Sequence, residues 1–199
     1  MELSKFKLIL GSQSPRRKEL LSWLKIKYEI VTADLDEVSN EVSAEKIAVD
    51  LAIQKARAVF EKCNSANNNF IIAADTIVVL DNQIYGKPKD RADAERILKE
   101  LSGKTHQVIT GVCFYFNNRE HAFFDLTDVT FNSIEQNLLD NYLDTNDSLD
   151  KAGAYGIQGP SLTFISKLNG SYSNVVGFPL DKIVVELQSL FGNDWRSKF

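Results

Sequence analysis

Hydrophobic and polar positions along this chain form two alternating patterns, which predict strands and helices in turn. Short apolar runs typical of strands cover residues 7–10, 28–31 and 70–80, and longer ones cover 106–116 and 121–131. Apolar residues with the spacing of one helix face follow Ser14 and recur over about 44–63, 91–101, 134–143 and 180–191. A last strand is expected over 162–168. Helix caps are expected at Ser43 and Ser133, each just before such a segment.

The order of these elements predicts an α/β fold. Strand–helix units near the N-terminus favour crossover connections, whereas the two long strands, joined at Asn117 and Asn118, indicate a hairpin. Together they predict a mixed central β-sheet flanked by helices. A cleft between two lobes would bring the scattered loops together. The 199 residues suit a single domain, residues 1–199, that is divided into two such lobes.

Composition excludes several classes of protein. A hydrophobic content of 44% supports a packed core, and a net charge of −4 argues against a general nucleic-acid binder. The two cysteines, Cys63 and Cys113, form neither a disulfide framework nor a zinc pattern. The N-terminus lacks the apolar region of a signal peptide, and no apolar run is long enough to span a membrane. A cytoplasmic protein without a membrane partner is therefore expected.

The most informative segment is the start of the first helix, where basic residues oppose the local field. Ser14 suits the N-cap and Pro15 suits the first helical position. Three basic residues follow, Arg16, Arg17 and Lys18, although a helix N-terminus carries positive partial charge and free N–H groups. A bound anion would resolve this conflict, so the segment predicts a polyanion site. The alternative is a solvated basic turn, and the pattern of a P-loop is absent.

Two carboxylates are candidates for catalysis or metal binding. Asp75 interrupts the apolar run 70–80, and a carboxylate is costly to bury there unless it is paired, hydrogen-bonded or bound to a metal. It could serve proton transfer or hold a divalent cation, or it could cap the backbone at a strand end. Glu37, in the acidic loop after the second strand, could complete a magnesium site with Asp75. The alternative for Glu37 is an ordinary solvated loop.

Two lysines and a glycine-rich loop are further candidates for ligand contacts. Lys55 lies among small and apolar residues of a long helix, and Lys87 lies between a glycine and a proline in a tight loop. Either lysine could meet a phosphate, or both could be merely exposed. Three glycines in 153–159 suggest close approach to a ligand or a flexible connector. In this loop Gln158 offers both a donor and an acceptor to a base edge.

The two histidines, His106 and His121, are too few and too far apart in sequence to form a metal cluster. Each is expected at the edge of a strand. A serine–histidine–aspartate arrangement cannot be assembled from the sequence. Hydrolysis by a nucleophilic triad is therefore not predicted.

Taken together, these segments resemble the Maf family of nucleoside triphosphate pyrophosphatases. The resemblance extends over nearly the whole chain, in order, and its specificity comes from the number of segments. They are SQSPRRKELL (12–21), LAIQKA (51–56), ADTIV (74–78), GKP (86–88), LSG (101–103), HQVITGV (106–112), DKAGAYGIQG (150–159) and GSYSNVVG (170–177). The segment 150–159 resembles the branch of the family that acts on dTTP and UTP.

The resemblance implies a reaction, a fold and an assembly. The reaction is hydrolysis between the α- and β-phosphates of a pyrimidine nucleoside triphosphate, canonical or modified, which yields the nucleoside monophosphate and pyrophosphate. It implies a divalent cation, Mg²⁺ or Mn²⁺, as cofactor. The implied fold is an elongated two-lobed α/β fold related to inosine triphosphate pyrophosphatases, and the implied assembly is a homodimer. Family members have a house-cleaning role and are also associated with arrest of cell division.

The resemblance also assigns roles by position. The side chains that would bind the triphosphate are Ser12, Arg16, Arg17, Lys55 and Lys87. Asp75 would be the catalytic base or a metal carboxylate, supported by Glu37, so that these two residues form the metal site. Lys55 would belong to the catalytic group with them. Thr76 and Gln158 would help to read the base.

Two other functions remain alternatives. The first is a nucleotide-binding regulator of septum formation that does not turn its ligand over. The presence of both Asp75 and Glu37 favours an enzyme, because binding an anion does not require carboxylates nearby. The second is a pyrophosphatase acting on inosine or xanthosine triphosphate. A panel of nucleotide substrates separates the three.

Overall fold

A seven-stranded sheet forms the centre of the computed structural model, which describes residues 5–64 and 68–199. Residues 1–4, on which part of the expectation for the N-terminus rests, lie outside the described residues, as do 65–67. The strands are β1 (Lys7–Leu10), β2 (Tyr28–Ile30), β3 (Asn69–Leu80), β4 (Gln83–Tyr85), β5 (Thr105–Phe116), β6 (Arg119–Phe131) and β7 (Ile165–Asn169). β1 runs parallel to β2 and β3, and the other pairs are antiparallel, so the predicted mixed α/β fold is confirmed.

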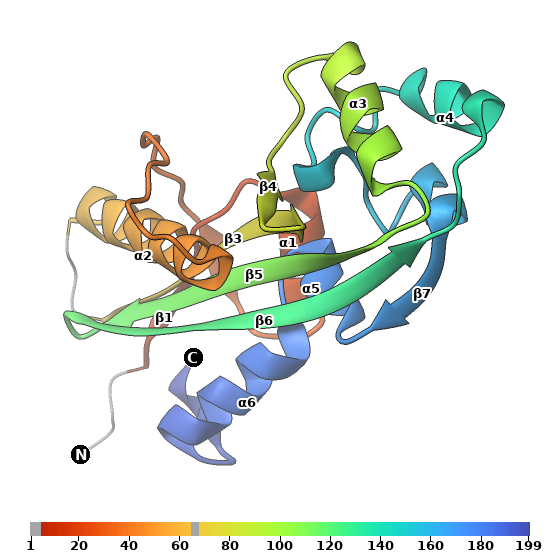
Figure 1. Cartoon of the computed structure of the whole chain (residues 1–199). Coiled ribbons are helices and arrows are strands. Elements are labelled where there is room, and N and C mark those ends of the chain that lie inside the picture. Colours follow the sequence, from red (N-terminus) through yellow and green to blue (C-terminus); the bar gives the residue numbers. More distant parts are fainter. Residues whose placement is uncertain (1–4, 65–67) are drawn as a thin grey trace.

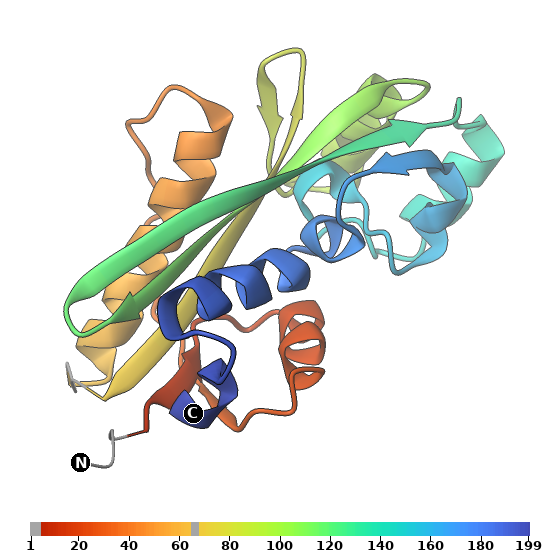
Figure 2. The same cartoon turned by 90° about the horizontal axis from the view of Figure 1, so that it is seen from below.

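Helices cover both faces of this sheet (Figure 1). They are α1 (Pro15–Ser22), α2 (Ala44–Lys62), α3 (Arg91–Leu101), α4 (Gln136–Leu143), α5 (Tyr172–Val176) and α6 (Leu180–Phe191), with short 3₁₀ turns at Ala152–Ala154, Pro160–Phe164 and Trp195–Lys198. α2 lies on one face, and α1 and α6 pack on the other (Figure 2). Within the described residues, no helix combines the length and the apolar character needed to cross a bilayer.

The sheet order, β2-β1-β3-β5-β6-β7, makes β3 the link between the parallel and antiparallel parts. The first part of β3 pairs with β1, from Asn69 to Ile72, and its last part pairs with β4, from Val78 to Leu80. Its other side pairs with β5 along nearly its whole length. Asp75 and Thr76 lie between the two pairings, where β3 has β5 as a neighbour and its other side faces the site described below.

Successive side chains of a strand point to opposite faces of the sheet, and here both sets are apolar, so both faces are covered by helices. Side chains of one parity pack with α2: Ile9, Ile71, Ala73 and Cys113. Those of the other parity pack with α1 and α6: Leu8, Leu10, Phe70, Ile72 and Phe114. Because both sets are apolar, these strands read as continuous hydrophobic runs, which is typical of strands buried on both sides.

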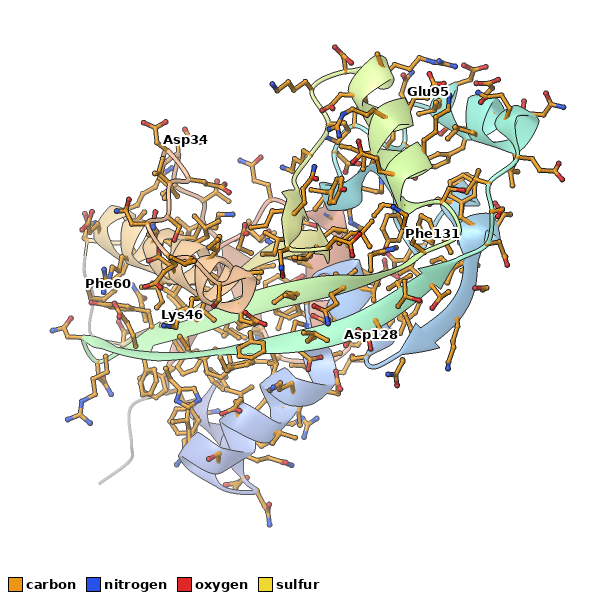
Figure 3. All side chains as sticks on the ribbon, in the orientation of Figure 1. Asp34, Lys46, Phe60, Glu95, Asp128 and Phe131 are labelled. Atoms are coloured by element: carbon orange, nitrogen blue, oxygen red, sulfur yellow. The ribbon has the colours of Figure 1, made fainter. Side chains whose placement is uncertain are left out.

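A separate apolar cluster occupies the other end of the sheet. There α3 and α4 pack on the last part of β3 and the first part of β5, with Ile97, Leu98 and Leu139 fully or nearly fully buried. Phe60 belongs to the cluster beneath α2 and Phe131 to this second cluster, and Figure 3 shows them toward opposite ends of the sheet. The clusters therefore hold different parts of the same strands.

The backbone of α2 lies very close to the sheet at Gly111 in β5. A Cβ built on Gly111 would overlap the backbone carbonyl of Ala48 and come within 2.5 Å of the Val49 nitrogen. Only a residue without a side chain allows the helix backbone to lie directly on the strand. This contact fixes the height of α2 above β3, and α2 carries Lys55.

Several local features differ from the sequence-based expectations. The helix expected from Ser133 begins at Gln136 with Glu135 as its N-cap, so the prediction of a Ser133 cap is wrong. The last strand starts at Ile165, because Pro160 begins a 3₁₀ turn that takes up the first part of the apolar run. The polar segment after Gly170 forms the short helix α5, capped by Ser171, whose side chain accepts a hydrogen bond from the Asn174 amide.

His106 is buried inside the sheet, with 1% of its surface exposed, so its expected place at a strand edge is wrong. Its Nε2 lies 2.7 Å from the Tyr155 hydroxyl, and its ring packs edge-on against Phe131. Burial disfavours the charged imidazolium and lowers the pKa of His106 to about 4, from an ordinary value of 6.5.

This burial predicts a specific acid sensitivity. Between pH 6.5 and pH 4 the unfolded chain binds a proton at His106 that the folded chain does not, so stability falls as the pH falls. The loss at pH 4 should be about 3 kcal/mol. Urea unfolding from pH 7 to pH 4 should therefore show a smaller decline for His106→Gln than for the unmodified protein. Equal declines for the two proteins would contradict this role of His106.

Candidate active site

A cleft of about 1000 Å³ opens where the turn after β1, the loop before α2, the middle of β3 and the glycine-rich loop meet. Asp34, at the tip of the loop before α2, marks its rim (Figure 3). The cleft is lined by all nine residues that the sequence nominated: Ser12, Arg16, Arg17, Glu37, Lys55, Asp75, Thr76, Lys87 and Gln158. These residues come from positions up to 146 apart in sequence, between Ser12 and Gln158, and the fold brings them together.

The turn between β1 and α1 presents polar groups to the cleft. Pro15 occupies the first helical position as expected, and Ser14 is the N-cap residue, although its side chain makes no capping hydrogen bond. Instead the Ser12 hydroxyl accepts a hydrogen bond from the Ser14 amide at 3.2 Å. Gly11 packs closely under this turn, since a Cβ there would lie 3.3 Å from both Ala73 and Val59.

Arg17 crosslinks the floor of the cleft. Its guanidinium donates to the carbonyl oxygens of Ala74 and Gly177, both at 2.8 Å, and to the hydroxyl groups of Thr76 at 3.1 Å and Ser12 at 3.4 Å. These bonds engage four of its five N–H donors. Desolvation lowers the pKa of Arg17, and the nearby Asp75 carboxylate opposes that effect. The Arg17 side chain therefore contacts the residues on both sides of Asp75, through the Ala74 carbonyl oxygen and the Thr76 hydroxyl.

Lys55 joins the two nominated carboxylates. Its ammonium lies 2.5 Å from Asp75 Oδ1 and 3.0 Å from Glu37 Oε2. The Lys55 and Asp75 side chains are 17% and 10% exposed, whereas Glu37 is 49% exposed. The Lys55–Asp75 pair is therefore more shielded from water than the Lys55–Glu37 pair. Opposite charges in such a setting interact more strongly than on an open surface.

The two carboxylates are the type of ligand that a divalent cation prefers. Within 5–64 and 68–199, no group of three or more histidine, cysteine or acidic side chains is arranged to hold a metal. Magnesium, however, commonly takes one or two carboxylates and completes its shell with phosphate oxygens and water. Asp75 and Glu37 already converge on one cationic group, the Lys55 ammonium. The donor set therefore matches a metal that arrives with a phosphate ligand.

A buried polar chain runs from the cleft floor into the sheet. Thr76 Oγ1 lies 3.0 Å from Thr110 Oγ1, which donates to the Asn174 carbonyl at 3.1 Å. The Asn174 amide group in turn donates to Val108 and Thr127, both at 2.9 Å. The sequence carries no individual signal for Thr110, because a single polar residue in a strand has no diagnostic spacing, whereas Asn174 ends the polar segment 170–174, which the sequence predicts as a turn closing the same site.

The opposite wall is built by the segment around Asp150 and Lys151. Asp150 Oδ2 accepts a hydrogen bond from Arg16 Nη1 at 3.0 Å, which joins α1 to this wall. Lys151 donates to Asp150 Oδ1 at 2.6 Å. Partial burial works to raise the pKa of Asp150, but the hydrogen bonds from Lys151 and Arg16 outweigh it and lower that pKa below its ordinary value. Both residues belong to the segment 150–159 that carries the family resemblance, yet neither was assigned a role.

The glycine-rich loop presents Gln158 directly after a run of mostly buried residues. Ala154 and Tyr155 pack in the cluster with α3 and α4, whereas Ile157 packs in the cluster with α1. Gly153 adopts φ of 69°, and a Cβ there would lie 2.8 Å from Val78, so the loop can lie directly on β3. Gln158 itself is exposed and lines the cleft.

Fold and site together define a mixed α/β protein whose cleft combines cationic side chains with a pair of carboxylates. The chain belongs to the Maf family: the family described as Maf-like protein matches residues 7–190. It is similar to a "dTTP/UTP pyrophosphatase" of Bacillus pumilus, 45% identical over 92% of this chain and 95% of the relative. A "dTTP/UTP pyrophosphatase" of Alkaliphilus oremlandii is likewise 45% identical to this chain, over 92% of this chain and 96% of that relative.

Among solved structures, the Ham1 protein of Staphylococcus aureus is similar over 63% of this chain and 71% of the Ham1 chain. The TM-score is 0.45 and the sequence identity is 15%.

Proposed function

We propose that this protein is a nucleoside triphosphate pyrophosphatase that hydrolyses dTTP and UTP to the nucleoside monophosphate and pyrophosphate. The observation that carries the proposal is the arrangement of Lys55 between Asp75 and Glu37 in a cleft that Arg16 also lines. The names of relatives that are 45% identical over most of their length support the same substrates.

The cationic groups of the cleft would bind the triphosphate. Arg16 and Lys87 line the cleft from different segments, so they can reach different phosphates. The N-terminal end of α1 adds free backbone N–H groups and a positive partial charge. Ser12 adds a hydroxyl beside it. Arg17, with most of its donors engaged, would act on the nucleotide through the one N–H that remains and through the frame that it holds.

Asp75 would accept a proton from the attacking water. The water oxygen forms a bond to the α-phosphorus, the bond from that phosphorus to the bridging oxygen breaks, and pyrophosphate leaves with the electron pair. Lys55, 2.5 Å from Asp75, would hold the carboxylate in place and offset charge that develops on phosphate oxygens. A positioned general base contributes about 10²–10⁴-fold to such a step.

A divalent cation, Mg²⁺ or Mn²⁺, is proposed as cofactor, with Asp75 and Glu37 as its protein ligands. When bound, it neutralises phosphate charge and orients the phosphate oxygens for attack. Both carboxylates already contact the same positively charged group, the Lys55 ammonium, which supports the assignment.

Thr76 and Gln158 are proposed to read the base. Both line the cleft, Thr76 on its floor and Gln158 on the loop above it. We further propose that the chain works as one two-lobed domain, as a homodimer in the cytoplasm, with neither nucleic acid nor membrane as partner. The continuous sheet and the net charge of −4 support the first and last of these proposals.

The proposed function predicts a defined substrate profile. Purified protein with magnesium should release pyrophosphate from dTTP and UTP faster than from CTP, ITP or ATP. Gln158 offers a donor and an acceptor to the uracil or thymine edge, which carries an N–H beside carbonyl oxygens, whereas cytosine presents an amino group there. Pyrophosphate release for each nucleotide, including modified pyrimidine triphosphates, measures this. Preferential release from ITP would keep the reaction and overturn the base assignment. Tight binding without release would replace the enzyme by a nucleotide-binding regulator.

A further inference from the structure

The lysine at position 151 is more deeply engaged than its place in a loop suggests. Its ammonium donates to the Asp147 carbonyl oxygen at 2.5 Å, to Asp147 Oδ1 at 2.7 Å and to Asp150 Oδ1 at 2.6 Å. The Lys151 side chain is only 10% exposed. All three donors of a buried ammonium are thus used within one short segment.

The stem of Lys151 lies directly under the glycine-rich loop. A Cβ built on Gly156 would lie 2.7 Å from Lys151 Cε and 2.8 Å from Cδ, closer than real side chains approach. At Gly159 a Cβ would lie 3.0 Å from Asp147 Oδ2. The loop on either side of Gln158 therefore lies against the Lys151–Asp147 pair with no space between them.

The loop has a second anchor below Gln158. The Ser161 hydroxyl donates to the Gly156 carbonyl at 2.7 Å and accepts from the Gly156 amide at 3.1 Å. Ile157 is 5% exposed, whereas Gln158 is exposed to the cleft. The residues next to Gln158 are thus held by Ser161 and by the stem of Lys151. The position of the Gln158 amide in the cleft therefore depends on where Lys151 places Gly156.

We propose that Lys151 is a positioning residue for base selection: paired with Asp147, it supports the loop at Gly156 and Gly159 and so fixes the place of Gln158 in the cleft. This inference rests on the proposed function, because it assigns Gln158 to the base. Lys151 acts through the loop, with its ammonium directed at Asp147 and Asp150.

Asp150 and Asp147 both pair with Lys151, but they have different further contacts. Asp150 takes one hydrogen bond from Lys151 and one from Arg16, whereas Asp147 meets Lys151 and lies outside the set of residues that line the cleft. Loss of the Asp150 charge should therefore alter the hold on Arg16 and the triphosphate for every base alike. Loss of the Lys151–Asp147 pair should alter selection among bases.

The test measures discrimination by equilibrium binding, without turnover. Dissociation constants of non-hydrolysable α,β-methylene analogues of dTTP and dCTP are compared for the unmodified protein, Lys151→Met, Asp147→Asn and Asp150→Asn. Methionine keeps the apolar stem under Gly156 and removes the charge. Lys99→Met is the matched control, since Lys99 pairs with Glu95 at 2.6 Å on the exposed face of α3. Gln158→Ala gives the discrimination that remains without base reading.

The expected result is a fall of about tenfold in the ratio of the two dissociation constants for Lys151→Met, the size of one lost hydrogen bond to the base. Asp147→Asn should shift the ratio in the same direction, and Asp150→Asn and Lys99→Met should leave it unchanged. A merely structural role would weaken both analogues equally and keep the ratio, which would overturn the proposal. Should Lys151→Met fail to fold in thermal unfolding, the ratio for Asp147→Asn decides. No discrimination by the unmodified protein would instead overturn the proposed substrate preference.

Discussion

Replacement of Asp75 by asparagine is expected to lower turnover of dTTP by about 10²–10⁴-fold while the protein still folds and binds nucleotide. Asparagine has the shape of aspartate but neither accepts the proton of the attacking water nor binds a divalent cation well. Lys55 keeps a partner in the variant, because Glu37 lies 3.0 Å from its ammonium. Single-turnover pyrophosphate release and nucleotide binding, measured on the same preparation, separate the lost chemistry from lost affinity.

Asp36→Asn is the matched control, since Asp36 lies in the acidic loop beside Glu37, is exposed, and is absent from the lining of the cleft. It should retain turnover close to that of the unmodified protein. Turnover of Asp75→Asn within a few-fold of normal would remove Asp75 from the mechanism. It would then leave Glu37 as the only nominated carboxylate.

The second large effect is expected from Gly111→Ala, which should destabilise the protein by about 1–3 kcal/mol or more. The new methyl group would overlap the Ala48 carbonyl in the backbone of α2, so the helix must move away from the sheet. Because Lys55 is on α2 and Asp75 is on β3, this movement should also lengthen the contact between them. Urea unfolding gives the change in the free energy of unfolding, and assays of dTTP hydrolysis give the effect on turnover at the site.

Gly86→Ala provides the control for this prediction, because a Cβ on Gly86 has no atom within 4 Å. Its stability should stay within about 0.5 kcal/mol of the unmodified protein. A Gly111→Ala protein as stable as Gly86→Ala would show that α2 shifts without cost. The close approach would then have no role in setting the site.

Much of the fold could be predicted from the sequence, because its signals are local. The apolar run 70–80 matches β3 within one residue, and the two long runs match β5 and β6 within two residues. The signals failed where two local preferences competed. Pro160 turned the start of an apolar run into a 3₁₀ helix, and Ser171 capped a helix too short to show a periodic pattern.

The composition of the cleft could also be predicted, but its pairings could not. Nine nominated residues line the cleft, and their roles stay predictions. The contact of Arg16 with Asp150 joins residues 134 apart, so it depends on how the chain folds back and not on any local pattern. The engagement of Arg17 depends likewise on the carbonyl groups of Ala74 and Gly177, which every residue type would supply.

The ion pairs of the cleft have a consequence for how a nucleotide arrives. Lys55 is paired with Asp75 and Glu37, and Arg16 with Asp150. An incoming triphosphate must therefore displace these carboxylates before it can bind Lys55 and Arg16. The net charge of −4 on the whole chain adds no general attraction for an anion. Selection of the ligand therefore falls to the rearrangement of short contacts inside the cleft, after collision.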